Sequence, residues 1–150
     1  MERGLAVVQR TSDTEKRLLR EADTYAGCND APLHVLRVVS PEEYQSVESA
    51  EVTSDFDRSG YEDPATSHFD EEITAFVEDA LEEPGTVETV VKVADEGDRV
   101  DTVLDAAAER DCDHVFLVGK RRSPTGKALF GDLTQDIILE FDGTVTLAMD

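Results

Sequence analysis

A short glycine-rich stretch, GKRRSPTGKALFGD at residues 119–132, combines the residue types that hold an anion. It carries four of the protein's 14 cationic side chains, in a molecule whose formal net charge is −21. Glycine lets a phosphate approach the backbone closely, and backbone N–H groups at helix starts attract negative charge. The stretch therefore predicts a phosphate site. The alternative is a solvated turn whose cations pair with the acidic surface.

The stretch is not a P-loop, although RRSPTGKA has a superficial likeness to one. Arg121 stands where the first glycine of a P-loop should be, and Ala128 replaces the Ser or Thr that binds Mg²⁺. The stretch also follows the fourth predicted strand of the chain rather than the first. We reject the P-loop interpretation.

Other chemistry-bearing residues give weaker patterns. His34, His68 and His114 lack metal-ligand spacing and are predicted to be core or rim residues. Cys28 and Cys112 are too few for a disulfide framework, which favours free or buried thiols. No Ser or Cys stands in a nucleophile elbow, and carboxylates are too widespread to assign an acid–base pair. We therefore name no catalytic residue and no metal ligand.

The composition restricts the partners and the compartment. Asp and Glu number 35 against 14 Lys and Arg, and they are spread along the whole chain. Such a surface repels polyanions, so nucleic acid and anionic membranes are not expected as partners. A dense carboxylate shell favours a halophilic protein; the alternative is a merely acidic mesophilic one. The apolar runs are far shorter than a membrane span and no signal peptide precedes them, which predicts a cytoplasmic protein.

The order of elements predicts the fold class. Five apolar runs are predicted strands: 4–9, 33–39, 86–93, 114–118 and 144–149. Four stretches with apolar residues at helical spacing lie between them. The first opens with a capping box of Ser12 and Glu15 and stops at Gly27, and the last opens with Asp132 and Gln135. Strands alternating with helices predict a parallel sheet with helices on both faces.

The chain is expected to form a single domain over residues 1–150. Residues 40–67 are polar and acidic, and they interrupt the pattern of strands and helices. We expect one helical turn there, opened by SPEEY, within an insertion or lid.

The element order and the glycine stretch resemble the universal stress proteins (UspA-like), in a variant similar to haloarchaeal members. Many members carry G-x-x-G-x9-G-S/T between the fourth strand and the last helix. Here Gly119 fits the first glycine, Arg122 stands at the second, Gly131 fits the third with one residue fewer between, and Asp132 stands at the hydroxyl position. The resemblance covers 4–149 apart from 40–67. It implies a Rossmann-like, adenine-nucleotide alpha-hydrolase-like fold with a five-stranded parallel sheet of order 3-2-1-4-5.

The resemblance also implies a stress-response sensor or signalling module that binds ATP or AMP. Its carried-over nucleotide residues are Gln9, Arg10, Val38, Gly119, Arg122, Ser123, Thr125, Gly126, Lys127, Gly131 and Asp132. Val38 would meet the adenine through its main chain. Arg10 stands where binding members usually have Asp. A carboxylate at Asp132 would oppose a phosphate about 4 Å away by roughly 4 kcal/mol, unless Mg²⁺ bridges the two.

In the resembled family the last strand pairs antiparallel across a two-fold axis. This implies a homodimer through residues 144–149, which are Thr144, Val145, Thr146, Leu147, Ala148 and Met149. The strand has no Lys or Pro to blunt its edge. Two alternatives stay open: a structural or interaction protein of this fold that binds no nucleotide, and, less favoured, a nucleotide hydrolase.

Overall fold

The computed structural model describes residues 1–52, 64–120 and 132–150. The elements in chain order are β1 (Gly4–Val8), α1 (Asp13–Cys28), β2 (Leu33–Val39), α2 (Pro41–Val52), α3 (Pro64–Ala80), β3 (Val87–Val93), the 3₁₀ turn η1 (Glu96–Asp98), α4 (Arg99–Glu109), β4 (His114–Gly119), α5 (Asp132–Glu140) and β5 (Thr144–Met149). The five predicted strands are confirmed, each with bounds within one residue of those expected.

The strands form one parallel sheet in the order β3-β2-β1-β4-β5, as expected. β1 lies in the middle, where Gly4 is opposite Leu33 of β2 on one side and His114 of β4 on the other. Every residue of β1 and β2 is buried, as their nearly continuous apolar sequences predict.

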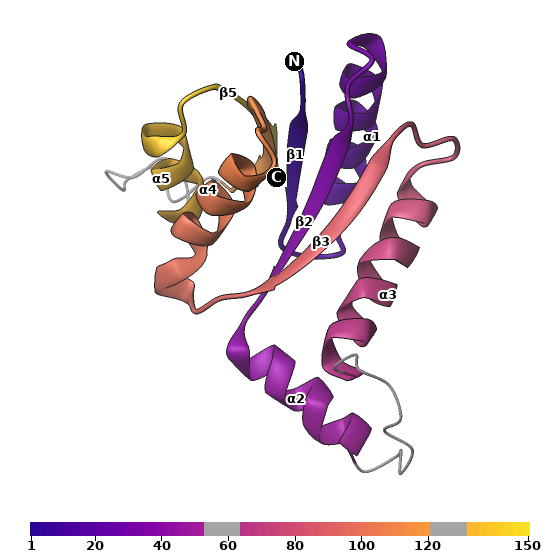
Figure 1. The fold of residues 1–150 in the computed structure, drawn as a ribbon, viewed down its shortest axis with the longest axis vertical. Coiled ribbons are helices and arrows are strands. Elements are labelled where there is room, and N and C mark those ends of the chain that lie inside the picture. The colour runs from indigo at the N-terminus through magenta and orange to yellow at the C-terminus, as the bar shows by residue number, and fades with distance from the viewer. Residues whose placement is uncertain (53–63, 121–131) are drawn as a thin grey trace.

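Helices cover both faces of the sheet (Figure 1). Ala6 and Val8 of β1 pack with α1 and α3, whereas Leu5 and Val7 pack with α4 and α5. This division follows from the alternation of side chains along a strand. Because the helices cover both faces, a ligand can reach the sheet only at its edges. In open parallel sheets this is the edge formed by the carboxyl ends of the strands, here those of β1, β2 and β4.

The capping box predicted for α1 is present. Ser12 Oγ accepts the backbone N–H of Glu15, and the Glu15 carboxylate reaches back to Ser12. The helix passes the predicted stop at Gly27 and ends at Cys28, and Asp30 then turns the chain with a φ of 53°.

The expectation of a single helical turn within residues 40–67 is wrong. α2 is a helix of 12 residues, and α3 already begins at Pro64. Ser40 Oγ accepts the N–H of Glu43 at 3.1 Å and so opens α2. Tyr44 of α2 stacks on Phe69 of α3, with ring centroids 6.4 Å apart. α2 therefore packs on a helix beyond the end of β2, rather than on the sheet (Figure 1).

Candidate functional site

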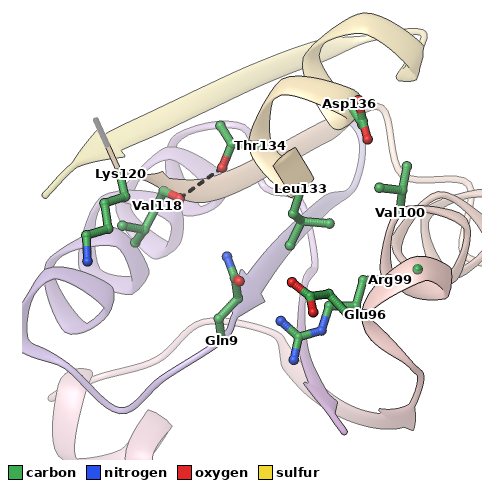
Figure 2. A pocket seen from close by; sticks show the side chains of 10 residues that line it. Gln9, Glu96, Arg99, Val100, Val118, Lys120, Leu133, Thr134 and Asp136 are labelled. Carbon is green, nitrogen blue, oxygen red and sulfur yellow. Dashed lines mark hydrogen bonds between the residues drawn. The ribbon is translucent and has the colours of Figure 1, made fainter. Parts of the chain in front are cut away.

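A cavity of about 660 Å³ lies at the carboxyl ends of β1 and β4. Strand order reverses between these two strands, and open parallel sheets bind ligands at such a point. Figure 2 shows the side chains around it. The described residues that line it are Gln9, Glu96, Gly97, Arg99, Val100, Val118, Lys120, Leu133, Thr134 and Asp136.

The starts of two helices border this cavity. Arg99 and Val100 belong to the first turn of α4, and Leu133 and Thr134 to the first turn of α5. Asp98, which precedes α4, makes no side-chain capping bond among the described residues. The first N–H groups of α4 therefore lack this partner, and such groups attract negatively charged ligands.

The cavity carries charges of both signs. Arg99 and Gln9 point toward its middle, and Lys120 stands on the opposite side of Gln9 from Arg99 (Figure 2). The Arg99 Nε atom is buried and has no hydrogen-bond partner within the described part of the chain. Glu96 and Asp136 add two carboxylates. Cations suit a phosphate, whereas carboxylates accept hydroxyl or amino groups, so the lining suits a ligand that has both.

In the turn after β1, backbone N–H groups that could bind an anion are already bonded to a carboxylate of the protein itself. Glu15 is only 3% exposed, and its carboxylate accepts the N–H groups of Gln9 at 2.7 Å and Arg10 at 2.9 Å and the Ser12 hydroxyl at 3.2 Å. These donors are therefore unavailable to a phosphate. The predicted residues Gln9 and Arg10 separate here: Gln9 lines the cavity, and Arg10 is exposed and is not among the described lining residues.

At the end of β2, a main-chain carbonyl is likewise already bonded, in this case to the Arg37 guanidinium. Arg37 is 9% exposed, and its Nη1 donates to the carbonyl oxygens of Val38 at 2.7 Å and Gln9 at 2.9 Å. Its Nη2 lies 3.5 Å from the Glu43 carboxylate of α2. The predicted residue Val38 is buried and is not among the described residues of the cavity wall. Its carbonyl, the group expected to meet a base, is bonded to Arg37.

Lys120 and Leu133, which flank residues 121–132 of the predicted glycine-rich stretch, both line the cavity. Gly119 ends β4 and its carbonyl accepts the N–H of Asp150, while the adjoining Lys120 lines the cavity. Asp132 begins α5, but its side chain and its expected capping contact with Gln135 lie outside the described part. The other predicted residues also lie outside the described ranges: Arg122, Ser123, Thr125, Gly126, Lys127 and Gly131.

Sequence reasoning missed the roles of Glu15, Arg37 and Arg99 at this edge. Glu15 was identified only as half of a capping box. Arg37 carried a signal that could have been used, because it is the one Arg within the apolar strand LHVLRVV. A charged residue inside a strand buried on both faces needs a local partner, and strand-end carbonyls are the nearest acceptors.

The remaining candidate residues lie away from the cavity. His34 and His114 are buried at the starts of β2 and β4, as predicted for core histidines, and burial lowers the pKa of each. His68 is exposed on α3. Cys28 is exposed and Cys112 is buried, both are free, and burial raises the pKa of Cys112 to about 11.

Two further absences hold for the described residues. They contain no group of three or more His, Cys, Asp or Glu side chains placed to hold a metal ion. In the same parts of the chain, no helix has the length and apolar character needed to span a membrane.

Known proteins share this fold. The sequence profile of the Universal stress protein family matches residues 2–148. UspA from Lactobacillus plantarum is 17% identical with a TM-score of 0.61, covering 98% of this chain and 97% of its own. A universal stress protein in complex with cAMP is 15% identical with a TM-score of 0.61, covering 99% and 96%. One from Archaeoglobus fulgidus in complex with dAMP is 18% identical with a TM-score of 0.54, covering 98% and 96%. No curated protein sequence matches.

Proposed function

The chain belongs to the universal stress protein family, and from this premise we propose that it is a stress-response module that binds an adenine nucleotide. The cavity between the ends of β1 and β4 carries the proposal, because it combines Lys120 and Arg99 with two helix starts. Its volume of about 660 Å³ suits a small-molecule ligand. Two solved proteins of similar fold were determined with cAMP and dAMP, which supports an adenine nucleotide.

The phosphates of ATP or AMP would lie near Lys120 and the start of α5. The glycine-rich stretch would add backbone donors at Gly126 and Gly131 and charged or hydroxyl donors at Arg122, Ser123, Thr125 and Lys127. Mg²⁺ would relieve the repulsion between a phosphate and Asp132. Glu96 and Asp136, which line the cavity, would accept hydroxyl groups of the ligand.

Self-association through β5 is part of the proposal. β5 is an edge strand, and Val145, Thr146 and Leu147 within it are only half-buried. The preceding helix α5 exposes Ile138 and 72% of Leu139. Half-buried apolar side chains on an unblunted edge strand favour pairing with a second copy through residues 144–149.

We further propose that the protein works in the cytoplasm of a salt-rich cell. The support is compositional: 35 carboxylates against 14 cations give a shell that stays soluble where salt screens charge.

Titration calorimetry with ATP and with AMP, in molar KCl and Mg²⁺, tests the nucleotide site. Lys120→Ala should weaken binding about tenfold or more, because it removes a charged hydrogen bond from an exposed residue. Lys16→Ala is the matched control, because Lys16 pairs with Asp79 away from the cavity and its loss should leave affinity unchanged. If the wild type gives no heat and displaces no fluorescent ATP analogue, the alternative without nucleotide binding replaces this proposal.

A further inference from the structure

Arg37 connects three parts of the chain at the end of β2. Its Nη1 bonds the carbonyls of Gln9, which follows β1, and Val38, which is in β2. Its Nη2 meets Glu43 in the first turn of α2. Glu43 is held near it because Ser40 caps α2 through the Glu43 N–H.

This guanidinium lies where the cavity stops. Val8 is the last residue of β1 in register with β2, opposite Arg37, so the Val38 carbonyl has no partner in β1. The next carbonyl, that of Val39, accepts the Ala94 N–H beyond β3, and successive carbonyls of a strand point to opposite sides. The Val38 carbonyl therefore points past the end of β1. Gln9 lines the cavity, but no residue of β2 is among its described lining residues.

We propose that Arg37 and Glu43 form a latch over the end of β2, and that a nucleotide base reaches the Val38 main chain only when the Arg37 guanidinium leaves. The inference rests on the proposed nucleotide site and adds its regulation. The phosphate half of the site, at Lys120 and α5, stays open while the latch is closed. The apparent affinity for a base-bearing ligand is then the affinity of the open state multiplied by the fraction of molecules whose latch is open.

The closed state of the latch is only weakly stabilised, so the latch can open. Arg37 Nε is buried and has no hydrogen-bond partner among the described residues, and a buried donor without a partner raises the free energy of the closed state. The Glu43 side chain is 51% exposed and its carboxylate lies 3.5 Å from Nη2, so this ion pair is weak. The two carbonyl bonds of 2.7 and 2.9 Å oppose opening.

Three probes separate the two halves of the site: adenosine, inorganic tripolyphosphate and ATP. Arg37→Met keeps an unbranched side chain about as long as the aliphatic part of Arg and removes the guanidinium donors. This variant should bind ATP about tenfold more tightly than the wild type and should gain measurable adenosine binding, with tripolyphosphate unchanged. Glu43→Gln, at a half-exposed position, should raise ATP affinity about two- to fivefold. Arg20→Met is the matched control, because Arg20 donates to the Ala80 carbonyl between α1 and α3 and its loss should change nothing.

Calorimetry decides among the outcomes, with a thermal melt to show that each variant is folded. If ATP affinity is the same in the wild type and both latch variants, the latch is refuted and the nucleotide site stands. If Arg37→Met weakens tripolyphosphate, Arg37 belongs to the phosphate half, which also refutes the latch. If no protein binds ATP or tripolyphosphate, the proposed function and the latch fail together. Should Arg37→Met not fold, Glu43→Gln decides alone.

Discussion

The Glu15 carboxylate accepts the backbone N–H of Gln9 at 2.7 Å, and the side chain of Gln9 lines the cavity. One buried side chain thus fixes the turn that carries a residue of the candidate site. A turn that presented the same donors to solvent could bind a phosphate, but here an internal anion already occupies them. A phosphate in the cavity would therefore need other donors, such as Lys120, Arg99 and the starts of α4 and α5.

Glu15→Gln should destabilise the fold by about 2 kcal/mol, because the amide gives weaker bonds and turns one end toward the N–H groups of the turn. Denaturant unfolding at fixed salt measures the change. Glu21→Gln is the control, since Glu21 is exposed on the same helix. Equal effects of the two substitutions would contradict the role assigned to Glu15.

The glycine-rich stretch should respond to charge at its two ends. Lys127→Ala should weaken ATP ten- to a hundredfold by removing one charged hydrogen bond of about 1.5–3 kcal/mol. Asp132→Ser should strengthen ATP binding, because it removes a like charge and keeps a residue that can cap α5. Titration calorimetry in molar KCl, with and without Mg²⁺, checks both. An unchanged ATP affinity of Asp132→Ser without Mg²⁺ would show that no phosphate lies beside that position.

Stability should fall as the solution becomes mildly acidic. Burial holds the pKa of His114 below its ordinary 6.5, although Asp113 partly opposes this. Below about pH 6.5 the unfolded chain therefore binds a proton that the folded chain does not, and the free energy of unfolding decreases as pH falls. His114→Gln removes this titration and can still bond the Thr146 hydroxyl, which lies 2.7 Å from the His114 ring. Its unfolding free energy should fall less steeply between about pH 6.5 and 5; an unchanged slope would place the pKa of His114 near its ordinary value.

Salt should stabilise the protein. With 35 carboxylates against 14 cations, self-repulsion is strongest in dilute buffer and is screened within about 3 Å at 1 M salt. The melting temperature should therefore rise from dilute buffer to molar KCl. A flat or falling curve in a thermal scan would remove the halophilic interpretation.

Val145→Pro should disrupt the proposed dimer, because proline removes a backbone donor from the edge strand. Sedimentation in high salt should give a dimer for the wild type and a monomer for the variant. Val145→Thr, which keeps the backbone donor, should remain dimeric. Either a wild-type monomer at micromolar concentration or a proline variant that stays dimeric would refute pairing through β5.

The sheet could be predicted because each strand is recognisable from its own short run of apolar residues. LHVLRVV and HVFLV are buried apolar runs, and their separation by helical patterns leaves few topologies. α2 could not be predicted in the same way. Its sequence PEEYQSVESAEV has no apolar stripe that would predict a helix packed on the sheet. Tyr44 instead packs on Phe69 of α3.

The location of the candidate cavity could be predicted from the sequence, but most of the side chains that line it could not. Parallel topology and glycine spacing locate it at the carboxyl edge, where Gln9 and Lys120 are found. The long side chains of Glu15 and Arg37 decide what this edge can still bind, and their partners depend on tertiary neighbours. Arg37, for example, reaches back to Gln9, 28 positions earlier in the chain. Short sequence patterns do not show such contacts between residues that are far apart in the chain.

The central position of β1 has a consequence for synthesis of the chain. The Glu2 N–H meets the Asp113 carboxylate at 3.1 Å across 111 positions, and β1 borders β4. A nascent chain can pair β1 with β2, and β2 with β3, early. One edge of β1 and the side chains of Leu5 and Val7 stay uncovered until α4 and β4 leave the ribosome. Incomplete chains therefore expose an unpaired strand edge at the centre of the future sheet, which is the condition that favours aggregation and chaperone binding.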